Sequence, residues 1–253
     1  MSRVYDFLAP LLGVSTSLAL LCVLFLIVKG RFGKYWIVFV YGLWELLATI
    51  GFTVADAMVK GTTTTTAATR TVGQMWYARI YWANDVLVDL FRFVLVIVLL
   101  YRAAEGMKRV PGKVLAGIVV VMIVLPFLLF PMNTRTAPED PFHLPYPRAS
   151  WFNSTSELLN FGAAIMNLML WATLAASRKR DPQILGVSLG LGIVVTGAAL
   201  AYGIRHLLGA REVAAIDNLF LNLTQLAGWV IWCRAFWPIK KLPKIEQSEK
   251  PAA

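Results

Sequence analysis

The sequence predicts an all-α integral membrane protein, built as a bundle of seven transmembrane helices. Hydrophobic residues make up 58% of the 253 residues, charged residues make up only 15%, and the mean hydropathy is +0.65. A soluble domain carries roughly 25% charged residues. The apolar residues form long runs, and the basic residues lie in short clusters between them. This pattern determines membrane topology. It therefore argues against a nucleic-acid partner, despite the net charge of +10.

Seven apolar runs are long enough to cross a lipid bilayer, which takes about 20 residues. Backbone polar groups in lipid must be paired within the segment, so each run is predicted to be a helix. The predicted spans are Phe7–Val28, Tyr35–Met58, Trp76–Tyr101, Val114–Met132, Trp151–Ala176, Gln183–Leu208 and Ala215–Trp237. They form one transmembrane domain, residues 1–238, followed by a polar cytoplasmic tail, residues 239–253.

The ends of several spans have recognisable signals. No small-residue cleavage site follows the first apolar run, which is therefore predicted to be a span and not a removed signal peptide. Pro126 and Pro131 are predicted to kink the outer half of the fourth span. The segment "STSE" ends at Glu157 and matches the capping box that begins a helix, here the fifth.

The sixth span contains "GVSLGLG", which places small residues four positions apart. The pairs are Gly186 with Gly190 and Ser188 with Gly192. Small residues at this spacing allow two helix backbones to approach closely. We therefore expect this segment to be a helix-packing surface.

The Lys and Arg residues give the orientation. One set of connections, together with the C-terminal end, holds 15 of them, and the opposite side holds 8. The side richer in Lys and Arg faces the cytoplasm. The N-terminus is therefore predicted to lie outside and the C-terminus inside.

Polar residues are predicted to line the interior of the bundle. On a helix, residues three, four or seven positions apart share a face, and the second, third, fifth, sixth and seventh spans have such polar stripes. The first and fourth spans have almost none and are predicted to be more exposed to lipid. A charge near the bilayer centre costs at least ~2.5–3.5 kcal/mol and needs a partner. Arg92 is therefore predicted to pair with Asp89, three residues away, with Glu45 as a second candidate.

These stripes provide the candidate residues for ligand binding or proton-linked function. A network that only holds helices together is the alternative. No catalytic or metal-binding residue is predicted, because Cys22, Cys233 and the two histidines lack metal-ligand spacing. The candidates are Glu45, Asp85, Asp89, Arg92, Asn160, His206, Asn218, Asn222 and Gln225.

The segment "RIYWANDVLVDL" resembles the third helix of microbial rhodopsins, which are also seven-helix proteins with the N-terminus outside. A retinal protein needs a lysine in the seventh span for the Schiff base. The seventh span here, "AIDNLFLNLTQLAGWVIWCRAFW", contains none. We therefore exclude retinal and predict no cofactor.

Three segments carry a further resemblance: "YARIYWANDVLVDLFRFVLVIVLLY", "LGVSLGLGIVVTGAALAYGI" and "DNLFLNLTQLAGWVIW". In these and in its layout the chain resembles an uncharacterised group of bacterial seven-helix membrane proteins, frequent in acidobacteria. It is more distantly similar to the seven-helix sensor regions of some bacterial signalling proteins. The resemblance implies a multi-pass protein of the bacterial cytoplasmic (inner) membrane and assigns no site residues.

Two functions agree with these observations. The first is a non-enzymatic, receptor-like or accessory bundle that binds a small ligand, lipid or partner through a polar pocket open to the outer face. Helix movement would pass the signal to a cytoplasmic protein partner. The alternative is a small-solute or proton-coupled transporter, because "DPQILG" resembles the Pro-Gln motif of transporters built from two three-helix halves. No repeat of the first three spans in the last three supports that alternative.

Overall fold

The computed structural model describes residues 2–30, 32–61, 67–103, 112–132, 134, 149–176, 181–208 and 210–238. The predicted tail, residues 239–253, lies outside the described residues. Those that are described form helices and no strands, which confirms the all-α class. The helices are α1 (Ser2–Gly30), α2 (Phe32–Gly61), α3 (Ala67–Ala103), α4 (Gly112–Leu129), α5 (Ala149–Ala176), α6 (Pro182–Leu208) and α7 (Ala210–Phe236).

Four of the described helices are long and apolar enough to cross a membrane. The qualifying segments are Pro10–Gly30, Phe32–Ala57, Ser150–Ala175 and Pro182–Ile204. In α4 the apolar segment, Ala116–Leu129, is shorter, and α3 and α7 do not meet the same standard. This result agrees with a membrane protein, and seven spans remain a prediction.

Two predicted helix ends differ from the structure. Helix α4 ends at Leu129 instead of Met132, because Pro131 has no N–H to continue the helix. Pro126 lies inside the helix, and its carbonyl oxygen accepts the last hydrogen bond, from the N–H of Phe130 at 3.0 Å. Helix α5 already begins at Ala149, so the predicted capping box ending at Glu157 is wrong.

The first turns of α5 are held by packing on its neighbour. Trp151 is buried, and its ring lies 5.1 Å from that of Phe127 in α4. This contact extends the helix on the N-terminal side of the "STSE" segment. Ser154 and Glu157 therefore lie within the helix and not at its start.

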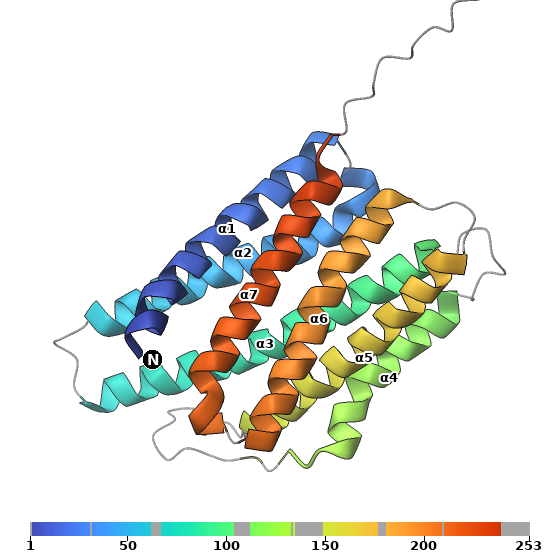
Figure 1. The fold of residues 1–253 in the computed structure, drawn as a ribbon. Coiled ribbons are helices and arrows are strands. Elements are labelled where there is room, and N and C mark those ends of the chain that lie inside the picture. Colours follow the sequence, from blue (N-terminus) through green and yellow to red (C-terminus); the bar gives the residue numbers. More distant parts are fainter. Residues whose placement is uncertain are drawn as a thin grey trace, which may run out of the picture.

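Helix α3 is the most central element of the bundle. It contacts α2, α4, α5 and α6, whereas α7 packs between α1 and α6. Figure 1 shows α1, α7 and α6 side by side, with α3 passing behind them. This position explains how α3 can carry ionisable side chains along a face that meets several other helices.

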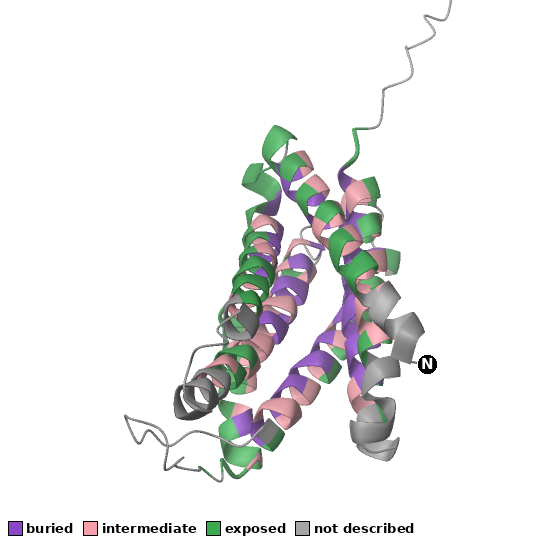
Figure 2. Ribbon diagram, turned by 90° about the vertical axis from the view of Figure 1, so that its left-hand side faces the viewer, coloured by how far each residue is buried: buried purple, intermediate pink, exposed green. Residues whose placement is uncertain are grey.

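The helices predicted to be most exposed, α1 and α4, differ in how much of their surface the other helices cover. Helix α4 contacts only α3 and α5 among the described residues, and its apolar side chains are mostly exposed. One face of α1, in contrast, is buried against α2 and α7 through Leu20, Val23 and Ile27. Figure 2 shows the buried residues facing the interior and exposed residues on the outer surfaces. The sequence pattern failed for α1 because this buried face is apolar.

The predicted packing surface of α6 is confirmed, and it serves two neighbours. A Cβ atom added to Gly190 would lie only 2.8 Å from the carbonyl oxygen of Gly228 in α7, so the two backbones meet closely. On another face, Ser188 donates a hydrogen bond to Oδ1 of Asn167 in α5, at 3.1 Å. Gly192 lies beside that amide, since an added Cβ would be 2.4 Å from Nδ2 of Asn167.

Candidate functional site

Arg92 is the centre of a buried polar network between α2 and α3. Its Nη1 donates a hydrogen bond to Oδ1 of Asp89 at 2.8 Å, and its Nη2 donates to Oε1 of Glu45 at 3.1 Å. Its Nε donates to the hydroxyl of Tyr41 at 3.1 Å, and that hydroxyl donates to the same Glu45 oxygen at 2.9 Å. The predicted pairing of Arg92 with Asp89 is confirmed, and Glu45 is a second partner.

Helical spacing explains why these groups meet. Asp89 and Arg92 are three residues apart on α3, and Tyr41 and Glu45 are four apart on α2, so each pair shares a face. The planar guanidinium carries five donors in a fixed fork, and here it uses donors on all three of its nitrogens. Asp89 and Glu45 are buried, so an unpaired charge at either position would be expensive.

Aromatic rings of α7 close one side of this network. The ring of Tyr41 stacks on that of Trp229 with centroids 5.6 Å apart and an interplanar angle of 13°. Trp232 packs edge-on against Trp229, at 4.9 Å, and its Nε1 donates to the carbonyl oxygen of Val187 in α6, at 2.8 Å. The network is therefore connected to α6 and α7 through aromatic packing.

Two polar residues of α5 face Asp89 from the opposite side. Ser156 and Asn160 are buried beside its carboxylate. The amide of Asn160 donates to the carbonyl oxygen of Ser156 at 2.9 Å, within its own helix. Oδ2 of Asp89 accepts no hydrogen bond of normal geometry from the described residues. A buried polar atom without a hydrogen-bond partner calls for an explanation.

A polar cavity of about 290 Å³ lies beside the network, between α3, α6 and α7. The hydroxyl of Tyr202 in α6 donates to Oδ2 of Asp85 in α3 across it, at 2.9 Å. Val194, Ala198 and Leu221 supply apolar surface. The polar lining residues are Tyr81, Asp85, Arg92, Tyr202, Asn218, Asn222, Thr224 and Gln225.

The structure brings most of the predicted candidates together. Asp85, Arg92, Asn218, Asn222 and Gln225 line the cavity. Glu45 and Asp89 join it through their bonds to Arg92, whereas Asn160 lies behind Asp89 and is not part of the lining. The side chain of His206 lies outside the described part of the chain.

Fewer helices line the cavity than the sequence predicts, and some of the lining residues were not among the predicted candidates. The prediction placed it between five helices, but three helices form its walls. Tyr202 and Thr224 were not identified as candidates. A signal for Tyr202 exists, because Val194, Ala198 and Tyr202 are four residues apart and share a face of α6.

The chemistry of the lining suits binding of a polar molecule. Amide, hydroxyl, carboxylate and guanidinium groups together offer both donors and acceptors. Among the described residues, no group of three or more His, Cys, Asp and Glu side chains is placed to hold a metal ion. The lining groups can form hydrogen bonds and ionic contacts with a polar molecule.

Comparison with known protein families, curated proteins and solved structures finds no match to this chain. The resemblance to acidobacterial seven-helix proteins and to sensor regions therefore stays a prediction. Function has to be argued from the geometry and chemistry of the site.

Proposed function

We propose that this protein is a non-enzymatic, receptor-like membrane bundle that binds a small polar solute in the cavity between α3, α6 and α7. The observation that carries this proposal is the convergence of polar side chains from three helices on one cavity. Polar and ionisable groups inside a membrane are expensive, and they usually serve a binding or transfer function. A purely structural network would not need an open polar volume next to it.

The size of the cavity limits the ligand. Its volume of about 290 Å³ is at the lower end of the range of ligand sites, roughly 300–1,000 Å³. It suits a molecule about the size of an amino acid or a small amide. Because the lining contains both donors and acceptors, the ligand should also carry both.

The position of the aromatic residues supports binding over transport. Gln225 lines the cavity, and Trp229, one turn further along α7, is buried against Tyr41. The cavity therefore ends at packed rings. A solute that bridges α3 and α7 would alter the packing of Trp229 on Tyr41, and so communicate with α2 and with a cytoplasmic partner.

The proposed topology has seven spans in the bacterial inner membrane, with the N-terminus outside. The cavity then extends into the outer half, because Tyr81 is in the first half of α3, Tyr202 in the second half of α6 and Asn218 in the first half of α7. Reporter fusions at Ala253 and in the Thr-rich segment after Lys60 test this topology. They should report opposite compartments, and matching compartments would contradict it.

Ligand binding can be tested with purified protein. Native mass spectrometry should reveal a co-purifying small solute, and a thermal-shift screen of amino acids, small amides and polyols should identify solutes that raise the unfolding temperature. A bound ligand stabilises by RT ln(1 + [L]/Kd), so the shift grows with concentration. Asn222→Leu should abolish the shift because it removes an amide from the cavity at similar volume.

Asn84→Leu is the matched control, since Asn84 is on α3 but lines a different surface, between α2 and α3. It should keep the solute-dependent shift. A shift that survives in both Asn222→Leu and Gln225→Leu would place the ligand elsewhere. Accumulation of the same solute in proteoliposomes would support the transporter alternative.

A further inference from the structure

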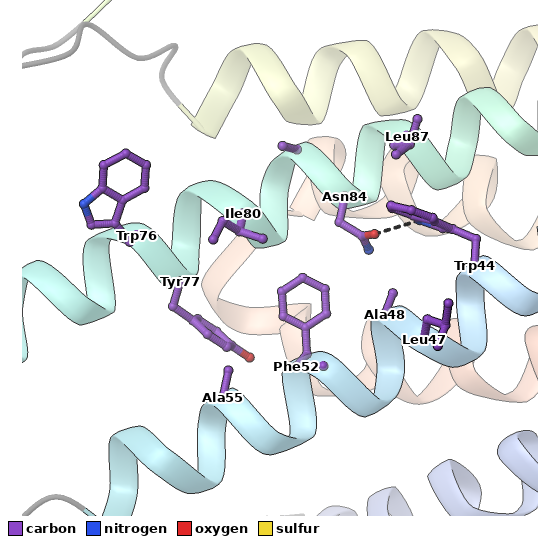
Figure 3. Close-up of a pocket in the computed structure, with 12 residues that line it drawn as sticks. Trp44, Leu47, Ala48, Phe52, Ala55, Trp76, Tyr77, Ile80, Asn84 and Leu87 are labelled. Atoms are coloured by element: carbon purple, nitrogen blue, oxygen red, sulfur yellow. Dashed lines mark hydrogen bonds between the residues drawn. The ribbon is translucent and has the colours of Figure 1, made fainter.

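A second hollow, separate from the polar cavity, lies on the outer surface of the bundle between α2 and α3. Its volume is about 770 Å³, and its walls are almost wholly apolar, with Leu47 and Phe52 from α2 and Ile80 and Leu87 from α3. Figure 3 shows this groove and the hydrogen bond at one end of it. There Nε1 of Trp44 donates to Oδ1 of Asn84 at 3.0 Å. Because these two polar groups bond to each other, the groove offers an apolar surface to an occupant.

The groove faces away from the rest of the protein. Leu47 and Ile80 are 56% and 57% exposed, so the groove is open along its side. Among the described residues, only α2 and α3 line the groove, and α2 meets α7 through Tyr41, which is not part of that lining. In a membrane, the surroundings of this surface are hydrocarbon.

We propose that the groove is a binding site for one acyl chain of an anionic bilayer phospholipid. The lining runs from Trp44 to Ala55 on α2 and from Trp76 to Leu87 on α3. At 1.5 Å per residue, each stretch is about 16 Å long. That is about half of the ~30 Å hydrocarbon core, and so matches the chain of a lipid in one leaflet.

Charge at one end of the groove favours a phospholipid over a second copy of the protein. Trp76 and Tyr77 lie at the N-terminal end of the α3 lining, and the guanidinium of Arg79 lies 4.8 Å from the centroid of the Trp76 ring. Trp and Tyr are enriched at the level of the lipid headgroups. Arg binds phosphate well through its planar fork. The phosphate is thus placed at this end, and the chain extends towards Trp44.

Small residues give the groove its depth. Gly51 faces open space, because a Cβ added to it would meet no atom within 4 Å, and Ala48 and Ala83 also line the groove. The exposed face of α1 is equally apolar, with Leu18 62% and Phe25 64% exposed, but it belongs to a single helix. That face is the natural control for general lipid contact.

The test uses the full chain in vesicles of phosphatidylglycerol and phosphatidylcholine that contain phosphatidylglycerol with a photoreactive diazirine on one acyl chain. Labelled peptides should map to residues 44–55 and 76–87 in excess over residues 11–28. Gly51→Phe fills the groove and should lower the groove labelling about tenfold, the effect of losing contact with about two methylene groups. Gly13→Phe is the matched control on α1, where an added Cβ also meets nothing within 4 Å, and should leave the labelling unchanged.

The labelling results distinguish a bound phospholipid from general lipid contact and from a second copy of the chain. Equal labelling of the groove and of the α1 face, or labelling that Gly51→Phe does not change, would overturn the proposal. Ala83→Phe fills the same groove from α3. It should also lower the groove labelling, and it replaces Gly51→Phe if that variant does not fold. Arg79→Gln should remove the preference for phosphatidylglycerol over an equally tagged phosphatidylcholine. Protein–protein crosslinks through the groove, with loss of lipid labelling, would assign it to a second copy of the chain.

Discussion

The two sides of the α2–α3 interface use different chemistry with neighbouring residues. Glu45 faces the interior and binds Arg92, whereas Trp44, the residue before it, faces the outer groove and donates one hydrogen bond to Asn84. Successive residues on a helix are about 100° apart, so adjacent positions can face opposite environments. The ion pairs of Arg92 lie on the interior side, where several partners surround them, and the bond between Trp44 and Asn84 on the groove side is neutral. The two sides should therefore differ in their sensitivity to mutation.

The largest effect is expected for Arg92→Leu. It leaves Glu45 and Asp89 buried without their cation, and breaking a buried ion pair typically costs ~3–5 kcal/mol. Thermal unfolding in detergent measures the loss. Arg92→Leu combined with Asp89→Asn should recover much of it, and further addition of Glu45→Gln should recover more. Additive losses in the combined variants would show that these groups do not interact.

Tyr41→Phe should have an intermediate effect. It removes the hydroxyl that connects Arg92 to Glu45 but keeps the ring that stacks on Trp229. Hydrogen bonds to charged groups contribute about 1.5–3 kcal/mol each. A chemical-denaturation midpoint compared with wild type measures it. An effect as large as that of Arg92→Leu would mean that the hydroxyl, and not the ion pairs, dominates this side.

Trp44→Phe tests the outer side of the interface. It removes the hydrogen bond to Asn84 and should cost about 1 kcal/mol, because the bond is between neutral groups. The same unfolding measurement applies, and Tyr41→Phe, which removes two hydrogen bonds to charged groups, is the comparison. If Trp44→Phe proved more destabilising than Tyr41→Phe, the contrast between the two sides would be wrong.

The smallest effect is expected at a charged contact outside the apolar region. Nζ of Lys34, at the start of α2, lies 2.6 Å from Oδ2 of Asp181. Asp181 also caps α6, where its Oδ1 accepts a hydrogen bond from the N–H of Gln183 at 2.9 Å. Partial burial acts in the opposite direction, but the bonds from Lys34 and from backbone N–H groups lower the pKa of Asp181 below its usual value.

Asp181→Ala should therefore cost about 0.5 kcal/mol near neutral pH, mostly through the lost cap. Because the pKa is lower in the folded state, the stabilisation is complete above the unfolded pKa of about 3.9 and is lost as the pH falls below it. Unfolding temperatures of the variant and wild type, measured from pH 7 to pH 3, should converge at the acid end. A constant difference would show that the carboxylate charge is not involved.

Helical spacing was enough to predict the polar interior, including the pairing of Arg92 with Asp89, because partners three residues apart lie within one helix. Partners on different helices were harder to predict. Glu45 was named from its expected depth, but the bond of Tyr202 to Asp85 joins residues 117 positions apart. The groove was not predicted, because an apolar hollow leaves no polar signal in a helix whose outer surface is already apolar. The capping box in α5 was predicted wrongly because a short motif cannot reveal packing on α4.

The bonds of the Arg92 guanidinium to groups on both α2 and α3 also have a consequence for membrane insertion. Helix α3 carries Asp85, Asp89 and Arg92 along one face, and two of the groups that bind Arg92 are supplied by α2. Alone, α3 would enter the bilayer with part of this charge unmatched. We expect α2 and α3 to leave the insertion machinery together, as a hairpin. A glycosylation-based insertion assay should therefore give more complete insertion of α3 when α2 precedes it, and less when that α2 carries Glu45→Leu.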